Sequence, residues 1–82
     1  MHLITLFHMR NVIGKRVRLA RKRRKPPLTQ EELAAALQLL DWDISRGGIA
    51  KIEGGFRQVT DMEVKKLAQA LKVSPAWLFE ED

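Results

Sequence analysis

Apolar positions recur with helical spacing along most of this chain, and no segment shows the alternation of a β-strand. The first helix is predicted over residues 11–24, where one apolar stripe is surrounded by arginine and lysine and consists of Ile13, Val17 and Ala20. The pair Pro26-Pro27 is expected to end it, because proline lacks an amide donor and disfavours helical geometry in the residue before it.

Four further helices are predicted from residues that cap helix N-termini. Thr29 with Glu32, and Thr60 with Glu63, have the spacing of a capping box, in which each side chain bonds the other residue's backbone amide. Ser45 is a good N-cap, and Ser74 is followed by proline at the first helical position. These signals predict helices over about 29–40, 45–53, 60–71 and 74–79.

The chain is therefore expected to be an all-α protein, a compact bundle of five short helices around one core. Its 82 residues allow one domain, which we place at residues 10–82. Residues 1–9 show no clear period and form an N-terminal extension. Three interpretations of this extension stay open: an arm that contacts a second copy in a dimer, a terminal segment that is disordered, or residues that precede a natural start at Met9.

Charge is distributed unevenly along the chain. There are 15 Lys and Arg against 10 Asp and Glu, a net charge of +5. Residues 10–28 contain nine of the basic residues and no acid, whereas all ten acids lie in residues 29–82. A strongly positive region favours a polyanionic partner, with nucleic acid ahead of an anionic membrane.

Catalytic and metal-binding chemistry finds little support. The chain has no cysteine, both histidines lie in residues 1–9, and Asp41 and Asp43 are too few ligands for a metal. We therefore expect no enzyme activity, cofactor, metal or small-molecule substrate. No apolar run approaches the roughly 18 residues that span a bilayer, and the opening residues make a poor signal peptide, so a cytoplasmic location is expected.

Four motifs in order carry a family resemblance: IGKRVRLARK, LTQEELAAAL, ISRGGIAKIEGG and VTDMEVKKLAQALKVSPAWLF. From Val12 to Phe79 the chain resembles the helix-turn-helix domain of the phage repressor and Cro type, also called the xenobiotic-response-element (XRE) type. The resemblance implies a lambda-repressor-like fold, a bacterial or phage-type regulator, and residues 45–53 as the recognition helix. The family typically has a tight glycine-containing turn before that helix. Here residues 38–44 intervene, and we interpret Trp42 as a packing residue.

With Ile49 and Ile52 directed inward, the outer face of the recognition helix holds four candidate base contacts: Arg46, Gly47, Ala50 and Lys51. Arginine can bond guanine through two hydrogen bonds, worth about 1–3 kcal/mol of discrimination. Lys51 could reach a guanine or a phosphate, and Ala50 suits a thymine methyl group. Gly47 leaves two readings open: sparse direct readout, or close approach of the helix to the groove.

Phosphate contacts are expected from the start of the second helix, the loop after the recognition helix and one residue late in the first helix. The resemblance implies that Gln30 contacts the DNA backbone and also braces the recognition helix, and that Arg21 pairs with Glu53. Arg57 is the strongest single phosphate ligand. The full set of expected phosphate contacts is Arg24, Thr29, Gln30, Phe56, Arg57 and Gln58.

The predicted function is a sequence-specific regulator that binds double-stranded DNA, a repressor that acts by occupying an operator. One small unit covers little DNA, so a homodimer on two half-sites is expected. Trp77, Leu78 and Phe79 are candidates for the dimer contact or, equally, for closing the core. The alternative function is a protein-interaction module or antitoxin-like adaptor on the same fold.

Overall fold

The helices begin where their capping residues indicate, except for the first. The computed structural model describes residues 10–81, and these contain α2 (Gly14–Arg23), α3 (Gln30–Gln38), α4 (Arg46–Glu53), α5 (Asp61–Leu71) and α6 (Pro75–Leu78), with no β-strand. Both capping boxes form, with Thr29 preceding α3 and Thr60 preceding α5. The hydroxyls of Ser45 and Ser74 each accept a hydrogen bond from the third amide of their helices.

The first helix starts three residues later than predicted. The side-chain oxygen of Asn11 accepts hydrogen bonds from the N–H groups of Ile13 and Gly14, at 3.0 and 2.8 Å. Asn11 thus satisfies two backbone amides at the start of α2 and lies outside the helix. At the other end α2 stops at Arg23, and Arg24 is extended, as expected shortly before Pro26.

The long connection between α3 and α4 is closed by Asp41 in a left-handed conformation, with φ of 65°. The N–H groups of Asp41 and Trp42 donate to the carbonyls of Gln38 and Leu37, at 3.1 and 3.0 Å, which completes the end of α3. Trp42 is half-buried and packs against the core, so its interpretation as a packing residue is confirmed. Aspartate tolerates this backbone region better than most non-glycine residues, which explains how the turn forms without glycine.

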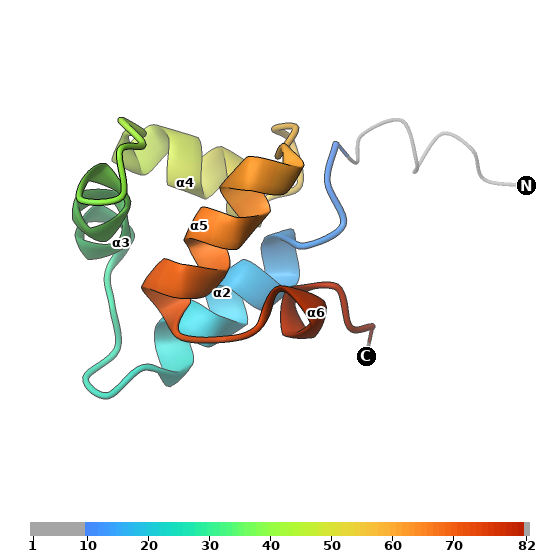
Figure 1. Cartoon of the computed structure of the whole chain (residues 1–82), viewed down its shortest axis with the longest axis horizontal. Helices are drawn as coiled ribbons and strands as arrows, with labels where there is room; N and C mark the ends of the chain where they lie inside the picture. The colour runs from blue at the N-terminus through green and yellow to red at the C-terminus, as the bar shows by residue number, and fades with distance from the viewer. Residues whose placement is uncertain (1–9, 82) are drawn as a thin grey trace, which may run out of the picture.

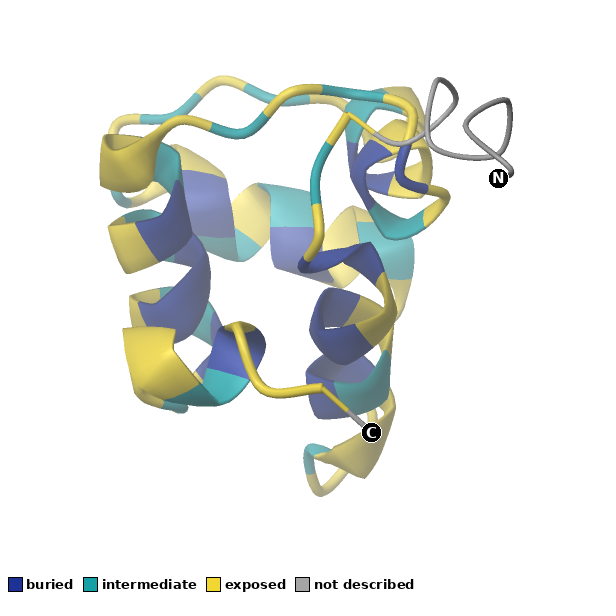
Figure 2. Ribbon diagram, turned by 90° about the vertical axis from the view of Figure 1, so that its right-hand side faces the viewer, coloured by how far each residue is buried: buried dark blue, intermediate teal, exposed yellow. Residues whose placement is uncertain are grey.

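One core joins all five helices (Figures 1 and 2). In Figure 1, α4 lies across one end of the molecule, and α5 passes in front of α2. The helix α4 packs on α2 and α3, while α5 packs on α2, α3 and α6. The buried apolar residues are Ile13, Val17, Ala20, Leu33, Leu37, Ile49, Ile52, Val64, Leu67, Ala68, Leu71 and Leu78. This arrangement confirms the all-α bundle, and no helix among residues 10–81 is long and apolar enough to cross a membrane.

Close contact between α2 and α4 depends on Gly14. A Cβ atom at this position would overlap the backbone carbonyl oxygen of Ile52 and would lie 2.8 Å from that of Glu53. Because backbone atoms cannot yield as a flexible side chain can, a larger residue would force the two helices apart. Gly14 therefore allows the end of α4 to lie directly against the start of α2.

Candidate nucleic-acid interface

The outer face of α4 has the orientation predicted from its sequence. Ile49 and Ile52 are completely buried, whereas the four residues of the opposite face are exposed: Arg46, Gly47, Ala50 and Lys51. Among residues 10–81, neither Arg46 nor Lys51 has a carboxylate within ion-pair distance. Both cationic side chains are thus available to a ligand outside the protein.

The two glycines of α4 have different surroundings. A Cβ atom on Gly48 would lie 2.6 Å from Cγ1 of Ile44, so the absence of a side chain there makes room for Ile44. A Cβ atom on Gly47 would meet nothing closer than Ser45 Oγ, at 3.7 Å. Packing therefore accounts for Gly48 only. Gly47 leaves the exposed surface of the first turn of α4 without a projecting side chain.

A hollow of about 490 Å³ lies between the N-terminal ends of α3 and α4. Its lining residues are Arg21, Thr29, Gln30, Glu31 and Arg46. Because the Thr29 hydroxyl accepts from the Glu32 amide, the two preceding amides of α3, those of Gln30 and Glu31, keep their N–H groups for an external acceptor. Such amides at a helix N-terminus suit a phosphate.

A three-residue network at the edge of this hollow holds α2, α3 and α4 together. Arg21 Nε and Nη2 donate to the two carboxylate oxygens of Glu53, at 2.7 and 2.9 Å, and Gln30 Nε2 donates to Glu53 Oε1 at 3.1 Å. The side chains of Arg21 and Glu53 are only 10% and 5% exposed. The ion pair that the resemblance implied is therefore present as a buried, bidentate contact.

The network also determines the charge of the surface around it. The hydrogen bonds from Arg21 to Glu53 raise the pKa of Arg21 further above its usual range, and they outweigh the opposite effect of burial. The negative charge of Glu53 is balanced by the positive charge of Arg21, and Gln30 donates to the same carboxylate. The carboxylate therefore repels a nearby phosphate less than an isolated one would. One N–H of the Gln30 amide remains after this bond, because a side-chain amide carries two.

The loop after α4 does not present its residues as expected. Phe56 and Gln58 are exposed, but Arg57 is half-buried. Arg57 Nη1 and Nη2 lie 3.2 and 3.3 Å from the Glu63 carboxylate oxygens, Nη1 also donates to the Gln58 carbonyl, and the guanidinium lies 5.5 Å from the centre of the Trp42 ring. Its guanidinium is thus already bonded within the protein, so a phosphate would compete with the Glu63 carboxylate for it, and the phosphate contact of Arg57 stays a prediction.

The pKa of Glu63 also reflects its contact with Arg57. Partial burial acts to raise the pKa of Glu63, but hydrogen bonds from Arg57 and from the Thr60 backbone and hydroxyl outweigh it, so the pKa lies below its usual range. The carboxylate is therefore charged at neutral pH and holds the Arg57 guanidinium at the start of α5.

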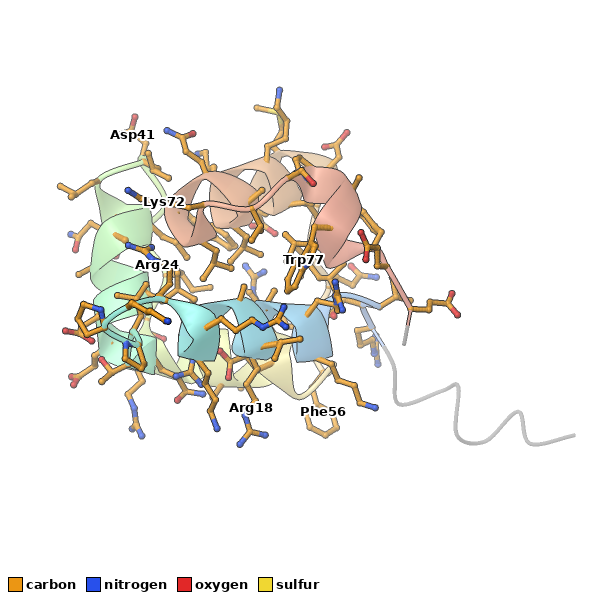
Figure 3. The ribbon with its side chains drawn as sticks, turned by 90° about the horizontal axis from the view of Figure 1, so that it is seen from below. Arg18, Arg24, Asp41, Phe56, Lys72 and Trp77 are labelled. Atoms are coloured by element: carbon orange, nitrogen blue, oxygen red, sulfur yellow. The ribbon has the colours of Figure 1, made fainter. Side chains whose placement is uncertain are left out.

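Arg24 does not join the residues around α4. Its Nη1 donates to the Ala70 carbonyl in the last turn of α5, at 3.0 Å, and it lines a separate hollow with Lys72 and Trp77. Figure 3 shows Arg24 beside Lys72, away from Arg18 and Phe56. The expected phosphate contact of Arg24 is therefore not supported. Arg24 lies away from α4, and one of its N–H groups donates to a carbonyl of α5.

The three candidate dimer residues have three different environments. Leu78 is completely buried in the core and so cannot contact a second copy. Trp77 is half-buried, and the Arg16 guanidinium lies over its ring, 3.7 Å from the centre. Phe79 is 52% exposed and, together with the exposed Val12, lines a hollow of about 210 Å³. Closure of the core accounts for Leu78, whereas a contact between copies stays a prediction for Phe79 and for the half-buried Trp77.

Asn11 is the residue of this region whose role the sequence did not indicate. Its side-chain amide donates to the carbonyls of Ile52 and Arg57, at 3.1 and 2.8 Å, and thus joins the start of α2 to the end of α4 and the following loop. An asparagine before a helix is a signal for a cap, but its partners more than 40 residues away are visible only in the folded chain. Asn11 positions the loop that carries Phe56.

Among residues 10–81, no group of three or more acidic or histidine side chains could hold a metal ion. Neither curated proteins nor solved structures yielded a match to this chain. A family model described as helix-turn-helix matches residues 17–78, from the first helix through α6. Since this match covers most of the chain and contains both α3 and the exposed face of α4, the protein belongs to the XRE-type helix-turn-helix family and is a DNA-binding regulator of that type.

Proposed function

We propose that the protein is a transcriptional repressor that occupies an operator in double-stranded DNA with α4 in the major groove. The observation that carries this proposal is the face of α4 that bears Arg46 and Lys51, exposed and unpaired with any carboxylate of residues 10–81. The major groove is about 12 Å wide and admits one helix, whose side chains can then reach the base edges.

The residues of this face divide into base contacts and backbone contacts. Arg46 lies in the first turn of α4, the part of a recognition helix that meets base edges. It donates two hydrogen bonds to a guanine, while Lys51 bonds a second guanine or a phosphate. Because Gly47 has no side chain and Ala50 has only a methyl group, α4 approaches the bases closely at these two positions. Ala50 contacts a thymine methyl group.

Backbone contacts surround α4 on both sides. The remaining N–H of Gln30 and the first amides of α3 bind one phosphate, at the hollow that Arg46 also lines. The exposed loop residues Phe56 and Gln58 contact the backbone beyond the other end of α4. These contacts set the register of the helix in the groove, whereas Arg46 supplies sequence discrimination.

Duplexes selected from a random pool provide the test of this function. Affinity for the selected duplex is measured between about 50 and 200 mM salt, and the logarithm of the binding constant should fall with the logarithm of the salt concentration by about 0.9 for each phosphate contacted. A steep slope together with a recurring selected sequence is the expected result. A slope near zero would contradict DNA binding and would favour the protein-interaction module.

A homodimer on two half-sites is the second part of the proposal, with Phe79 as the contact between copies. Replacing Phe79 with aspartate is expected to shift the protein toward the monomer in sedimentation and to weaken binding to a two-site operator, because a charge then faces the partner's apolar surface. Leu39→Asp is the control, since Leu39 is exposed on another part of the molecule, at the end of α3. Unchanged sedimentation of the Phe79 variant would rule out this contact.

A further inference from the structure

Two basic residues of α2 lie beside the proposed DNA-binding face, although neither was among the expected contacts. Arg18 and Lys22 are exposed, and neither has an ion-pair partner among residues 10–81. Together they line a hollow of about 290 Å³ whose other walls include Gln30, Ala50 and Gly54. The hollow thus joins α2 to the two elements that carry the proposed interface.

The position of these side chains follows from the residues that α2 buries. Val17 and Ala20 point into the core, and the buried Arg21 points toward the end of α4. Residues three and four apart lie on one face of a helix, so Arg18 and Lys22 share an edge on the same side as Arg21. Figure 3 shows Arg18 directed outward on the same side of the molecule as Phe56.

The hollow is positively charged despite the carboxylate in its wall. Glu53 is the one acidic residue among those that line it, and Arg21 and Gln30 already occupy its oxygens. The charges of Arg18 and Lys22 are therefore not cancelled nearby. Positive groups in a concave surface attract a polyanion more strongly than the same groups on a flat one.

We propose that Arg18 and Lys22 bind the phosphodiester backbone of the same DNA duplex, which makes α2 a third DNA-contacting helix beside α3 and α4. This inference rests on the proposed function, since the backbone is the part of the duplex that passes the hollow when α4 lies in the groove. Side chains four residues apart on a helix have Cβ atoms about 5–6 Å apart, which lets the pair hold neighbouring phosphates of one strand.

The double variant Arg18→Gln with Lys22→Gln tests the proposal against Arg23→Gln on the same helix. Arg23 is also exposed, but it lines a different hollow with Leu71 and Trp77. The double variant is expected to lower the salt slope by about 1.8, since each phosphate contact contributes about 0.9, and to weaken selected and random duplexes equally. Arg23→Gln should leave the slope close to that of the unchanged protein, and thermal unfolding verifies that all variants fold.

Each contrary outcome identifies what has failed. An unchanged slope in the double variant, while the unchanged protein still shows a steep one, overturns the role of α2 and leaves the proposed function intact. A reduction of the slope by about 0.9 in Arg23→Gln, half the loss expected of the double variant, shows an effect of net charge alone and also overturns it. Selective loss of the selected duplex would mean that the pair reads bases rather than phosphates. A flat slope in the unchanged protein overturns the proposed function itself.

Discussion

Replacing Arg46 with alanine is expected to reduce the preference for the selected operator by about 1–3 kcal/mol while binding to random DNA weakens much less. The side chain is exposed in the first turn of α4, and no carboxylate of residues 10–81 lies within ion-pair distance to compete for its donors. A two-pronged bond to guanine is lost entirely on truncation, whereas a phosphate contact contributes similarly to every sequence. Titrations of both duplexes at one salt concentration give the difference.

The matched control is Arg23→Ala, which removes an exposed arginine of α2 that lines a hollow without any residue of α4. This variant should bind both duplexes nearly as the unchanged protein does. Equal weakening of selected and random duplexes by Arg46→Ala would make Arg46 a phosphate ligand and would leave Lys51 as the main candidate for base recognition.

Replacing Glu53 with glutamine is expected to lower the free energy of unfolding by about 3–5 kcal/mol. Glutamine keeps the shape of the side chain but removes the charge that compensates Arg21, and both partners are almost completely buried. Removal of one partner leaves the other as an uncompensated charge in a poorly solvated position, which costs more than the pair itself contributes. Urea unfolding followed by circular dichroism measures the change.

Glu80→Gln provides the control for this second result. Glu80 pairs with Arg16 at 3.3 Å, but its side chain is 60% exposed, and Arg16 keeps its contacts with Trp77. Loss of that exposed carboxylate should cost no more than about 1 kcal/mol. If Glu53→Gln were as mild as Glu80→Gln, and DNA affinity were also unchanged, the buried network would have no part in holding α2, α3 and α4 together.

The starts of α3 to α6 could be predicted from the sequence because each depends on local contacts. Thr29, Ser45, Thr60 and Ser74 bond amides three residues away, so the relevant partners lie within one turn of the chain. The start of α2 was predicted three residues too early. Asn11 lies outside the helix and accepts from the amides of Ile13 and Gly14, and its own amide is held by carbonyls more than 40 residues distant.

The cationic residues were harder to assign, because all arginines are alike in sequence. Arg24 and Arg57 were expected at phosphates, but each is bonded to a neighbouring element of the protein. Arg18 was not among the expected contacts, yet it lines the hollow beside α4. The difference lies in which carboxylates and carbonyls the fold brings within reach of each guanidinium.

The sequence by itself determined the helical content, the caps of four helices, the buried face of α4 and therefore the outward direction of Arg46 and Lys51. These features depend on the period of the α-helix and on hydrogen bonds within a single turn. Only the tertiary structure decided that Arg24 and Arg57 are bonded to other elements of the protein, that Leu78 closes the core, and that Arg18 and Lys22 lie beside α4. Those assignments depend on distances between helices that are remote in sequence, and such distances exist only after the core has packed.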